Sequence, residues 1–175
     1  MQEHSPQQKQ KGFTLIEVLV TLVILAIGLL GLAGLQAASL QHNNSAYQRS
    51  QATFLAYEML DRMRSNPQGL EADVYNAIDT GSLPGDPGCI SSSCTPADLA
   101  STDTEEWATN LAAALPSGRG IITGTAANAP FTVTVMWDDE RTGATGTGCD
   151  STDATDMTCF SVTGQVFYDR LSSVL

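Results

Sequence analysis

The sequence contains little positive charge. Of its 175 residues, eight are Lys or Arg and 19 are Asp or Glu, which gives a formal net charge of −11. A surface of this kind repels the phosphates that a nucleic-acid-binding protein has to neutralise. Direct binding of nucleic acid is therefore not expected.

Histidine and lysine are especially scarce. The two lysines, Lys9 and Lys11, both precede a long apolar run, and beyond residue 12 the only histidine is His42. A nucleophile paired with a histidine base needs a second polar group beside that histidine, and no acid or cysteine is near His42 in the sequence. We expect neither catalysis nor a bound cofactor, and hence a protein that is not an enzyme.

The cysteines are few but even in number. Cys89, Cys94, Cys149 and Cys159 all follow the apolar run, which indicates two disulfides formed in an oxidising compartment such as the periplasm. Four cysteines allow three connectivities, and the short loops favour Cys89–Cys94 with Cys149–Cys159. Zinc binding is the alternative, although the C-x4-C and C-x9-C spacings lack a tight pair of ligands and no histidine lies beyond His42.

The apolar run covers residues 13–35, FTLIEVLVTLVILAIGLLGLAGL. As a helix rising about 1.5 Å per residue, it is long enough to cross a hydrocarbon core of roughly 30 Å. Positive charge precedes the run and does not return until Arg49, which favours a cytoplasmic N-terminus and an exported body. Residues 1–12 are polar and contain Pro6, so they are expected to be a removable leader.

The helix is predicted to continue to residue 65, because no proline or strong turn occurs before Asn66-Pro67-Gln68-Gly69. In this second half, apolar residues are predicted to form one face, with Gln48 off it. That predicted face contains Leu40, Tyr47, Phe54, Leu55, Met59 and Met63.

The remaining sequence is predicted to form a small domain. Residues 70–103 are rich in Gly and Pro and are read as turns, followed by a helix over 104–115 capped by Asp103 and Glu106. Strands are predicted at residues 120–125, 131–137 and 159–168, with an acidic connection at 138–158. The expected fold class is α+β, with a long N-terminal helix, membrane-spanning in its first half, packed on a small antiparallel sheet. The expected divisions are 1–12, 13–35, 36–66 and 67–175.

An acidic residue, Glu17, interrupts the apolar run. An ionisable side chain there costs about 2.5–3.5 kcal/mol on insertion scales and is functional by default. The run contains no basic residue to pair with it. Cleavage after Gly12 would create an amine at Phe13, one helical turn away, and the same amine of a neighbouring subunit could neutralise Glu17. The alternative is an ordinary anchor helix with a stray glutamate.

The string KGFTLIEV, residues 11–18, resembles the class III signal of type IV pilins and type II secretion pseudopilins. The resemblance implies a pilin-like fold and a prepilin peptidase that cuts between Gly12 and Phe13 and methylates the new Phe13 amine. It also implies an assembly role for Glu17.

Later patches of sequence resemble the PilV family of minor pilins, the type IV pilus modification proteins. They are AYEMLDRMRSNP at residues 56–67, Trp107 with Leu111 and LPSG at 115–118, and VTVMW at 133–137. The resemblance implies a subunit that helps to initiate or cap a type IV pilus, held first in the inner membrane and later at the pilus tip. The implied partners are the prepilin peptidase, the major pilin and other minor pilins.

Two other functions remain open at this stage. A minor pseudopilin of a type II secretion system shares every physical feature above, and a membrane-anchored periplasmic binding module would keep residues 1–12. Asp150, Asp153 and Asp156 offer carboxylates to calcium, but their spacing differs from an EF-hand loop, so a solvated acidic loop is favoured and no metal site is predicted.

Overall fold

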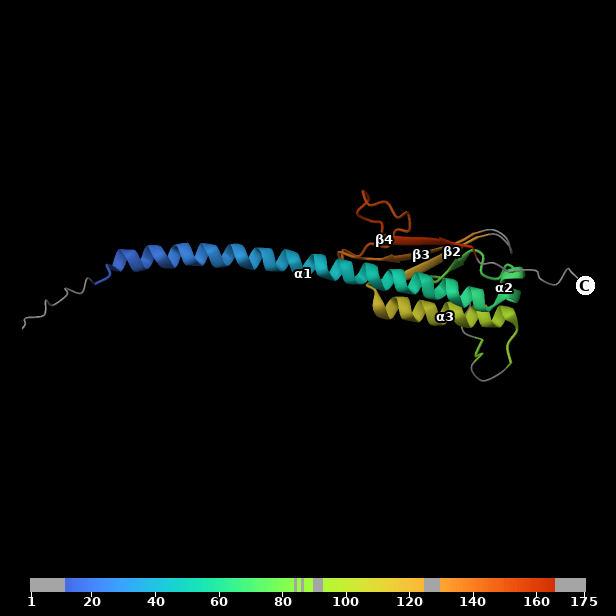
Figure 1. Ribbon diagram of the computed structural model, residues 1–175. Helices are drawn as coiled ribbons and strands as arrows, with labels where there is room; N and C mark the ends of the chain where they lie inside the picture. Colours follow the sequence, from blue (N-terminus) through green and yellow to red (C-terminus); the bar gives the residue numbers. More distant parts are fainter. Residues whose placement is uncertain (1–11, 84, 86, 90–92, 125–129, 166–175) are drawn as a thin grey trace, which may run out of the picture. The chain divides into compact units, whose positions relative to one another are not determined.

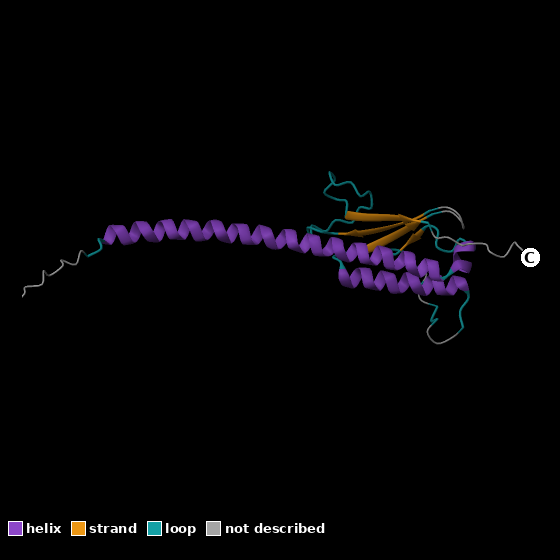
Figure 2. Cartoon of the chain, viewed as in Figure 1, coloured by secondary structure: helices purple, strands orange, loops and turns teal. Residues whose placement is uncertain are grey.

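The computed structural model describes residues 12–83, 85, 87–89, 93–124 and 130–165 (Figure 1). The chain divides into two compact units, residues 1–44 and 45–175. The first contains the beginning of a long helix, and the second contains the rest of that helix and all the other elements (Figure 2). The elements are α1 (Leu15–Ser65), α2 (Pro67–Glu71), β1 (Ile78–Asp79), α3 (Pro96–Ala114), β2 (Arg119–Thr123), β3 (Phe131–Trp137) and β4 (Thr158–Gly164).

Helix α1 begins at Leu15, two residues later than predicted, and ends at Ser65 as predicted. Within residues 15–35 every side chain is exposed, and by length and composition α1 can cross a membrane. Asn66 ends the helix and caps the short α2, because its side-chain oxygen accepts a hydrogen bond from the backbone N–H of Gly69 at 3.1 Å. Pro67 occupies the first position of α2. Proline has no backbone N–H, and at this position an N–H would have no partner within the helix.

The sheet has four antiparallel strands in the order β1-β2-β3-β4. The α+β class with a long helix and a small antiparallel sheet is thus confirmed. In β3 the alternating residues Phe131, Val133 and Val135 are buried, as expected of a strand with one face on the core. The predicted bounds of β3 are correct, while β2 and β4 begin at Arg119 and Thr158. The predicted strand ends at residues 125 and 166–168 lie outside the described residues.

Helices α1 and α3 both contribute to the main core on one face of the sheet. Glycines in two strands allow close contact: a Cβ at Gly120 of β2 would collide with the ring of Trp107 on α3, and one at Gly164 of β4 would lie 3.1 Å from Leu60 of α1. The core contains buried apolar residues from α1, from α3 and from the sheet. Its largest fully buried side chains include Trp107 and Trp137.

A second, smaller cluster lies under the connection between β3 and β4. Met136, Ala144 and Met157 are buried together, with Ile121 and Cys159 packed against them. Because Met136 alternates with Val135 along β3, this cluster is on the opposite face of the sheet from the helices. The acidic connection therefore covers part of that face.

Two predictions about the helices are wrong. Helix α3 begins at Pro96, and its capping box is formed by Thr95 and Asp98 instead of Asp103 and Glu106. The predicted single apolar face of α1 also separates into two. Leu55, Met59 and Met63 are buried, as is Gln48, whereas Leu40, Tyr47 and Phe54 are exposed.

Candidate processing and assembly site

The expected cleavage site lies just before α1. Gly12, Phe13 and Thr14 are exposed and non-helical, and Phe13 is 84% exposed. The helix starts with the N–H of Glu17 donating to the carbonyl oxygen of Thr14 at 3.1 Å. An exposed, non-helical peptide bond is a favourable substrate for a peptidase. Residues 1–11 of the expected leader lie outside the described residues.

Glu17 lies in the first turn of α1, where the helix macrodipole favours a negative charge. Among the described residues, no hydrogen bond or ion pair engages its carboxylate. The nearby polar side chain of Thr21 instead donates to the carbonyl oxygen of Val18 at 2.8 Å, so its hydroxyl is satisfied within the helix. The exposed apolar segment thus presents one acidic group that has no hydrogen-bond or ion-pair partner among the described residues.

At the other end of α1, Arg62 connects two helices. Its guanidinium contacts Glu58 at 2.9 Å, Asp103 at 3.2 Å and Glu106 at 2.7 Å. Burial lowers the pKa of Arg62, but hydrogen bonds to Glu106, Glu58 and Asp103 outweigh that effect and raise the pKa overall. The arginine stays charged and fixes the last turns of α1 to α3.

A buried phenol extends this network. The Tyr75 hydroxyl donates to Asp103 at 3.1 Å and accepts from the side-chain amide of Asn66 at 3.0 Å. Burial raises the pKa of Tyr75 well above its usual range. The amide of Asn66 also donates to the carbonyl oxygen of Pro96 at 2.8 Å. Sequence reading assigned Asp103 to a helix cap and missed this network. Within this network, only the pair of Glu58 and Arg62 could have been predicted from the sequence, because residues at an i,i+4 spacing on a helix are neighbours.

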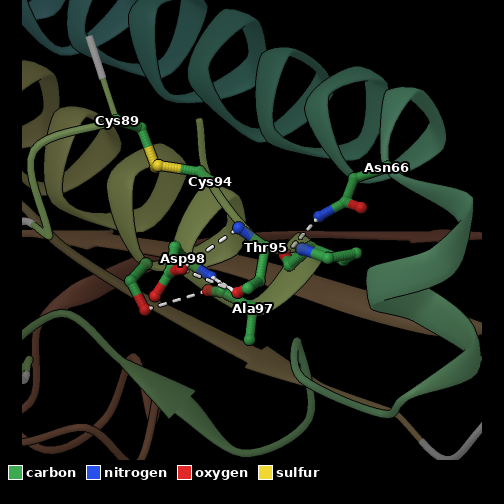
Figure 3. The surroundings of a disulfide bond; sticks show 8 residues. Asn66, Cys89, Cys94, Thr95, Ala97 and Asp98 are labelled. Carbon is green, nitrogen blue, oxygen red and sulfur yellow. Dashed lines mark hydrogen bonds between the residues drawn. A yellow bond between two sulfur atoms is a disulfide. The ribbon is translucent and has the colours of Figure 1, made fainter. Parts of the chain in front are cut away.

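The first disulfide lies directly before α3. Cys89 is bonded to Cys94, with their Cα atoms 5.5 Å apart, and the chain then enters the helix at Thr95 (Figure 3). The Thr95 hydroxyl accepts from the N–H of Asp98 at 3.2 Å, and the Asp98 carboxylate accepts from the N–H of Thr95 at 3.1 Å. Hydrogen bonds from Thr95 hold the pKa of Asp98 below its usual range.

The second disulfide joins Cys149 to Cys159, so the structure has the connectivity favoured from the sequence. It attaches the acidic connection to β4. The connection and Arg49 line a pocket of about 490 Å³.

Carboxylates in this connection accept hydrogen bonds from its own backbone. Asp150 accepts from the N–H of Thr152 at 2.8 Å, and Asp153 accepts from the N–H of Thr155 at 2.9 Å. Bonds from the hydroxyl and the N–H of Thr152 lower the pKa of Asp150, and bonds from the N–H and the hydroxyl of Thr155 lower the pKa of Asp153. These bonds also shape the loop. In the described part of the chain, no group of three His, Cys, Asp or Glu residues is placed to hold a metal ion.

Two family models match adjacent parts of the chain. Residues 7–33 match the prokaryotic N-terminal methylation motif, and residues 34–105 match the model described as type IV pilin Tt1218. Neither a curated protein nor a solved structure matches the chain. Residues 7–33 are therefore similar to a prepilin-type methylation motif and residues 34–105 to a type IV pilin domain, and these two similarities support a pilin or pseudopilin role.

Proposed function

We propose that the chain is a minor pilin, a structural subunit that helps to initiate or cap a type IV pilus. The observation that carries the proposal is the exposed apolar start of α1, with Glu17 in its first turn, inside the segment that matches the methylation motif. That motif implies processing by a prepilin peptidase and assembly with other pilins. The peptidase cuts between Gly12 and Phe13 and methylates the Phe13 amine.

The mature N-terminus then supplies the partner that Glu17 lacks. A positively charged amine at Phe13 of one subunit pairs with Glu17 of its neighbour, within lipid or within the filament. Because both charges are taken out of water, the loss of one partner costs about 3–5 kcal/mol. The pairing therefore favours ordered incorporation of neighbouring subunits and penalises a subunit that lacks its acid.

The topology of the subunit follows from its charges. Residues 1–12 face the cytoplasm, residues 13–35 span the inner membrane, and the rest of α1 with the globular domain at 67–175 enters the periplasm. The two disulfides at Cys89–Cys94 and Cys149–Cys159 fit an oxidising compartment. After extraction from the membrane, the subunit occupies the pilus and, as part of a minor-pilin complex, its tip. A minor pseudopilin would use the same site, and the test below separates the two by the filament recovered.

The test compares the wild-type chain with Glu17→Leu. A simple anchor gains from removing a buried acid, by about 2.5–3.5 kcal/mol on insertion scales, whereas a filament subunit loses its pairing partner. We expect Glu17→Leu to be cleaved and inserted at normal level but recovered poorly from sheared pili. Mass spectrometry of the wild-type chain should find N-methylated Phe13 as the first residue.

Thr21→Leu provides the matched control, because it also replaces a polar side chain in the apolar segment, one whose hydroxyl is bonded within the helix. It should be incorporated normally. Equal incorporation of Glu17→Leu and wild-type chains, or an intact Met1 in cells with active peptidase, would refute the proposal. Incorporation into secretion pseudopili and absence from pili would identify the pseudopilin instead.

A further inference from the structure

The two disulfides lie in different electrostatic surroundings. Cys89–Cys94 lies directly before α3, because the residue after Cys94 is Thr95, the N-cap of that helix (Figure 3). Cys149–Cys159 instead joins the acidic connection to β4. A disulfide opens when a thiolate attacks one of its sulfurs and the other sulfur leaves as a thiolate, so the surroundings of the leaving sulfur affect the rate. The two bonds should therefore differ in reactivity.

A thiolate formed at Cys94 would lie at the N-terminus of a 19-residue helix. The positive end of the helix macrodipole favours an anion there, and thiolates at helix N-termini are stabilised. Pro96 has no N–H, and the N–H of Asp98 donates to the Thr95 hydroxyl at 3.2 Å. Among the described residues, the N–H of Ala97 has no acceptor. One donor in the first turn is thus open to an anion.

One carboxylate opposes this effect. Hydrogen bonds from Thr95 hold the pKa of Asp98 below its usual range, so the side chain is an anion. Its carboxylate accepts from the Thr95 hydroxyl at 2.7 Å and from the Thr95 N–H at 3.1 Å. These two donors spread the charge of Asp98 into the capping box. At the start of α3, a leaving thiolate therefore meets one hydrogen-bonded carboxylate and the positive end of a helix.

The second disulfide is surrounded by many more carboxylates. Both of its cysteines line the pocket in the acidic connection, where Arg49 provides one positive charge against six carboxylates, those of Asp138, Asp139, Glu140, Asp150, Asp153 and Asp156. This excess repels a leaving thiolate and an incoming one. Cys159 is also packed against the cluster that contains Met136 and Met157, and an apolar contact further disfavours a thiolate. Exchange at this bond is therefore slow, even though Cys149 is exposed.

We propose that Cys89–Cys94 is a thiol-exchange site, at which a dithiol reductant opens the bond in the folded protein, and that Cys149–Cys159 is the structural disulfide. First, a thiolate of the reductant attacks Sγ of Cys89, forms a mixed disulfide and releases Cys94 as a thiolate. Then the second thiolate of the reductant attacks the reductant sulfur of the mixed disulfide and releases Cys89. The reductant is oxidised to a cyclic disulfide, and its two protons end on the two cysteines.

Opening this disulfide leaves the fold in place. The start of α3 is held independently, because the Asn66 amide donates to the carbonyl oxygen of Pro96 at 2.8 Å and Thr95 forms the capping box with Asp98. Further along α3, the buried indole of Trp107 donates to the carbonyl oxygen of Leu55 at 2.9 Å. Thiol exchange is thus compatible with the folded unit. The inference goes beyond the proposed function and holds whether or not the chain enters a filament.

Partial reduction of the oxidised full chain in mild detergent tests the site. Dithiothreitol is added, samples are quenched with an alkylating reagent, and peptide mapping follows each disulfide over time. We expect Cys89–Cys94 to open about tenfold faster than Cys149–Cys159, while the tryptophan fluorescence stays that of the folded protein. Equal rates, or earlier opening of Cys149–Cys159, overturn the proposal. Opening of Cys89–Cys94 that occurs only together with loss of the fluorescence overturns it as well.

Charge variants at Ala97 test the physical cause. This residue is exposed and lies in the first turn of α3, three residues after Cys94. Ala97→Asp should slow the opening of Cys89–Cys94 about threefold, and Ala97→Lys should speed it by about the same factor, because the leaving thiolate is an anion. Ala97→Asn is the uncharged control and should match wild type. Rates that do not follow the charge at residue 97 contradict the role given to the helix N-terminus.

Reductants of opposite charge test the acidic surroundings of the second disulfide. The ratio of the two opening rates should be larger with the anionic thiol mercaptoethanesulfonate than with the cationic thiol cysteamine, because the carboxylates repel the first and attract the second. High salt should reduce this difference. The same ratio with both thiols would show that the carboxylates do not protect Cys149–Cys159.

Discussion

The buried hydrogen bond between Tyr75 and Asp103 should give a measurable coupling free energy between these two residues in the unfolding of the second unit. The phenol is fully buried and donates to the carboxylate at 3.1 Å. Asp103→Ala removes the acceptor of that hydroxyl among the described residues and leaves a buried donor unsatisfied, which costs about 1–3 kcal/mol. Arg62 loses little, because Glu58 and Glu106 still contact it at 2.9 and 2.7 Å.

Tyr75→Phe removes the other half of the same contact. The Asn66 amide keeps its bond to the carbonyl oxygen of Pro96, and Asp103 keeps Arg62, so the expected cost is that of the two hydrogen bonds made by the hydroxyl, about 0.5–1.5 kcal/mol each. The double variant has no phenol, so it contains no buried hydroxyl that lacks an acceptor. The combined cost should therefore fall short of the sum of the single costs by about 1 kcal/mol.

The assay is urea unfolding of the oxidised full chain in mild detergent. Trp107 and Trp137, the only two tryptophans, are at most 1% exposed, so their fluorescence reports loss of the core. Glu105→Ala provides the control on α3, because its carboxylate takes no part in these contacts. Strictly additive costs for Tyr75→Phe and Asp103→Ala would refute the coupling.

Two further predictions concern acid stability and packing. Arg119 donates to Asp79 at 2.8 Å, and this contact lowers the pKa of Asp79 in the folded protein. The pair therefore stabilises the fold at pH values above about 3.9, the pKa of an aspartate in the unfolded chain. This stabilisation is lost as the pH falls through the lower pKa that Asp79 has in the folded protein. Arg119→Gln should begin to lose fluorescence at a higher pH than wild type, and superimposable acid titrations would contradict this. Gly120→Ala should destabilise the unit by about 1–3 kcal/mol in urea, because its Cβ meets the Trp107 ring. Gly34→Ala, whose Cβ meets nothing within 4 Å, should be neutral.

Local signals predicted much of the fold. The end of α1 at Ser65 follows from Asn66-Pro67, because a proline disfavours helical geometry in the residue before it. The bounds of β3 follow from the alternation of Val133 and Val135 with threonines. Both features depend only on neighbours in the sequence, which is why they could be read without a structure.

The start of α3 differs from the prediction because the sequence contains two possible capping boxes. Thr95 with Asp98 and Asp103 with Glu106 have the same spacing, and the prediction places Pro96 in a turn. In the structure Pro96 is at the first helical position, where its missing N–H costs nothing. Asp103 is then inside the helix, available to Arg62 from a segment 41 residues away. No local pattern distinguishes a capping carboxylate from one that makes a tertiary contact.

The same limit applies to the apolar residues of α1. Periodicity grouped Tyr47 and Phe54 with Leu55 and Met59, although at 100° per residue these pairs diverge around the helix. The structure buries the second pair and exposes the first. A helix that had only its own domain to contact would need one apolar face, as surface helices usually do. The apolar residues on the second face stay exposed in the described part of the unit, and a helical period alone does not separate them from the residues that face the core.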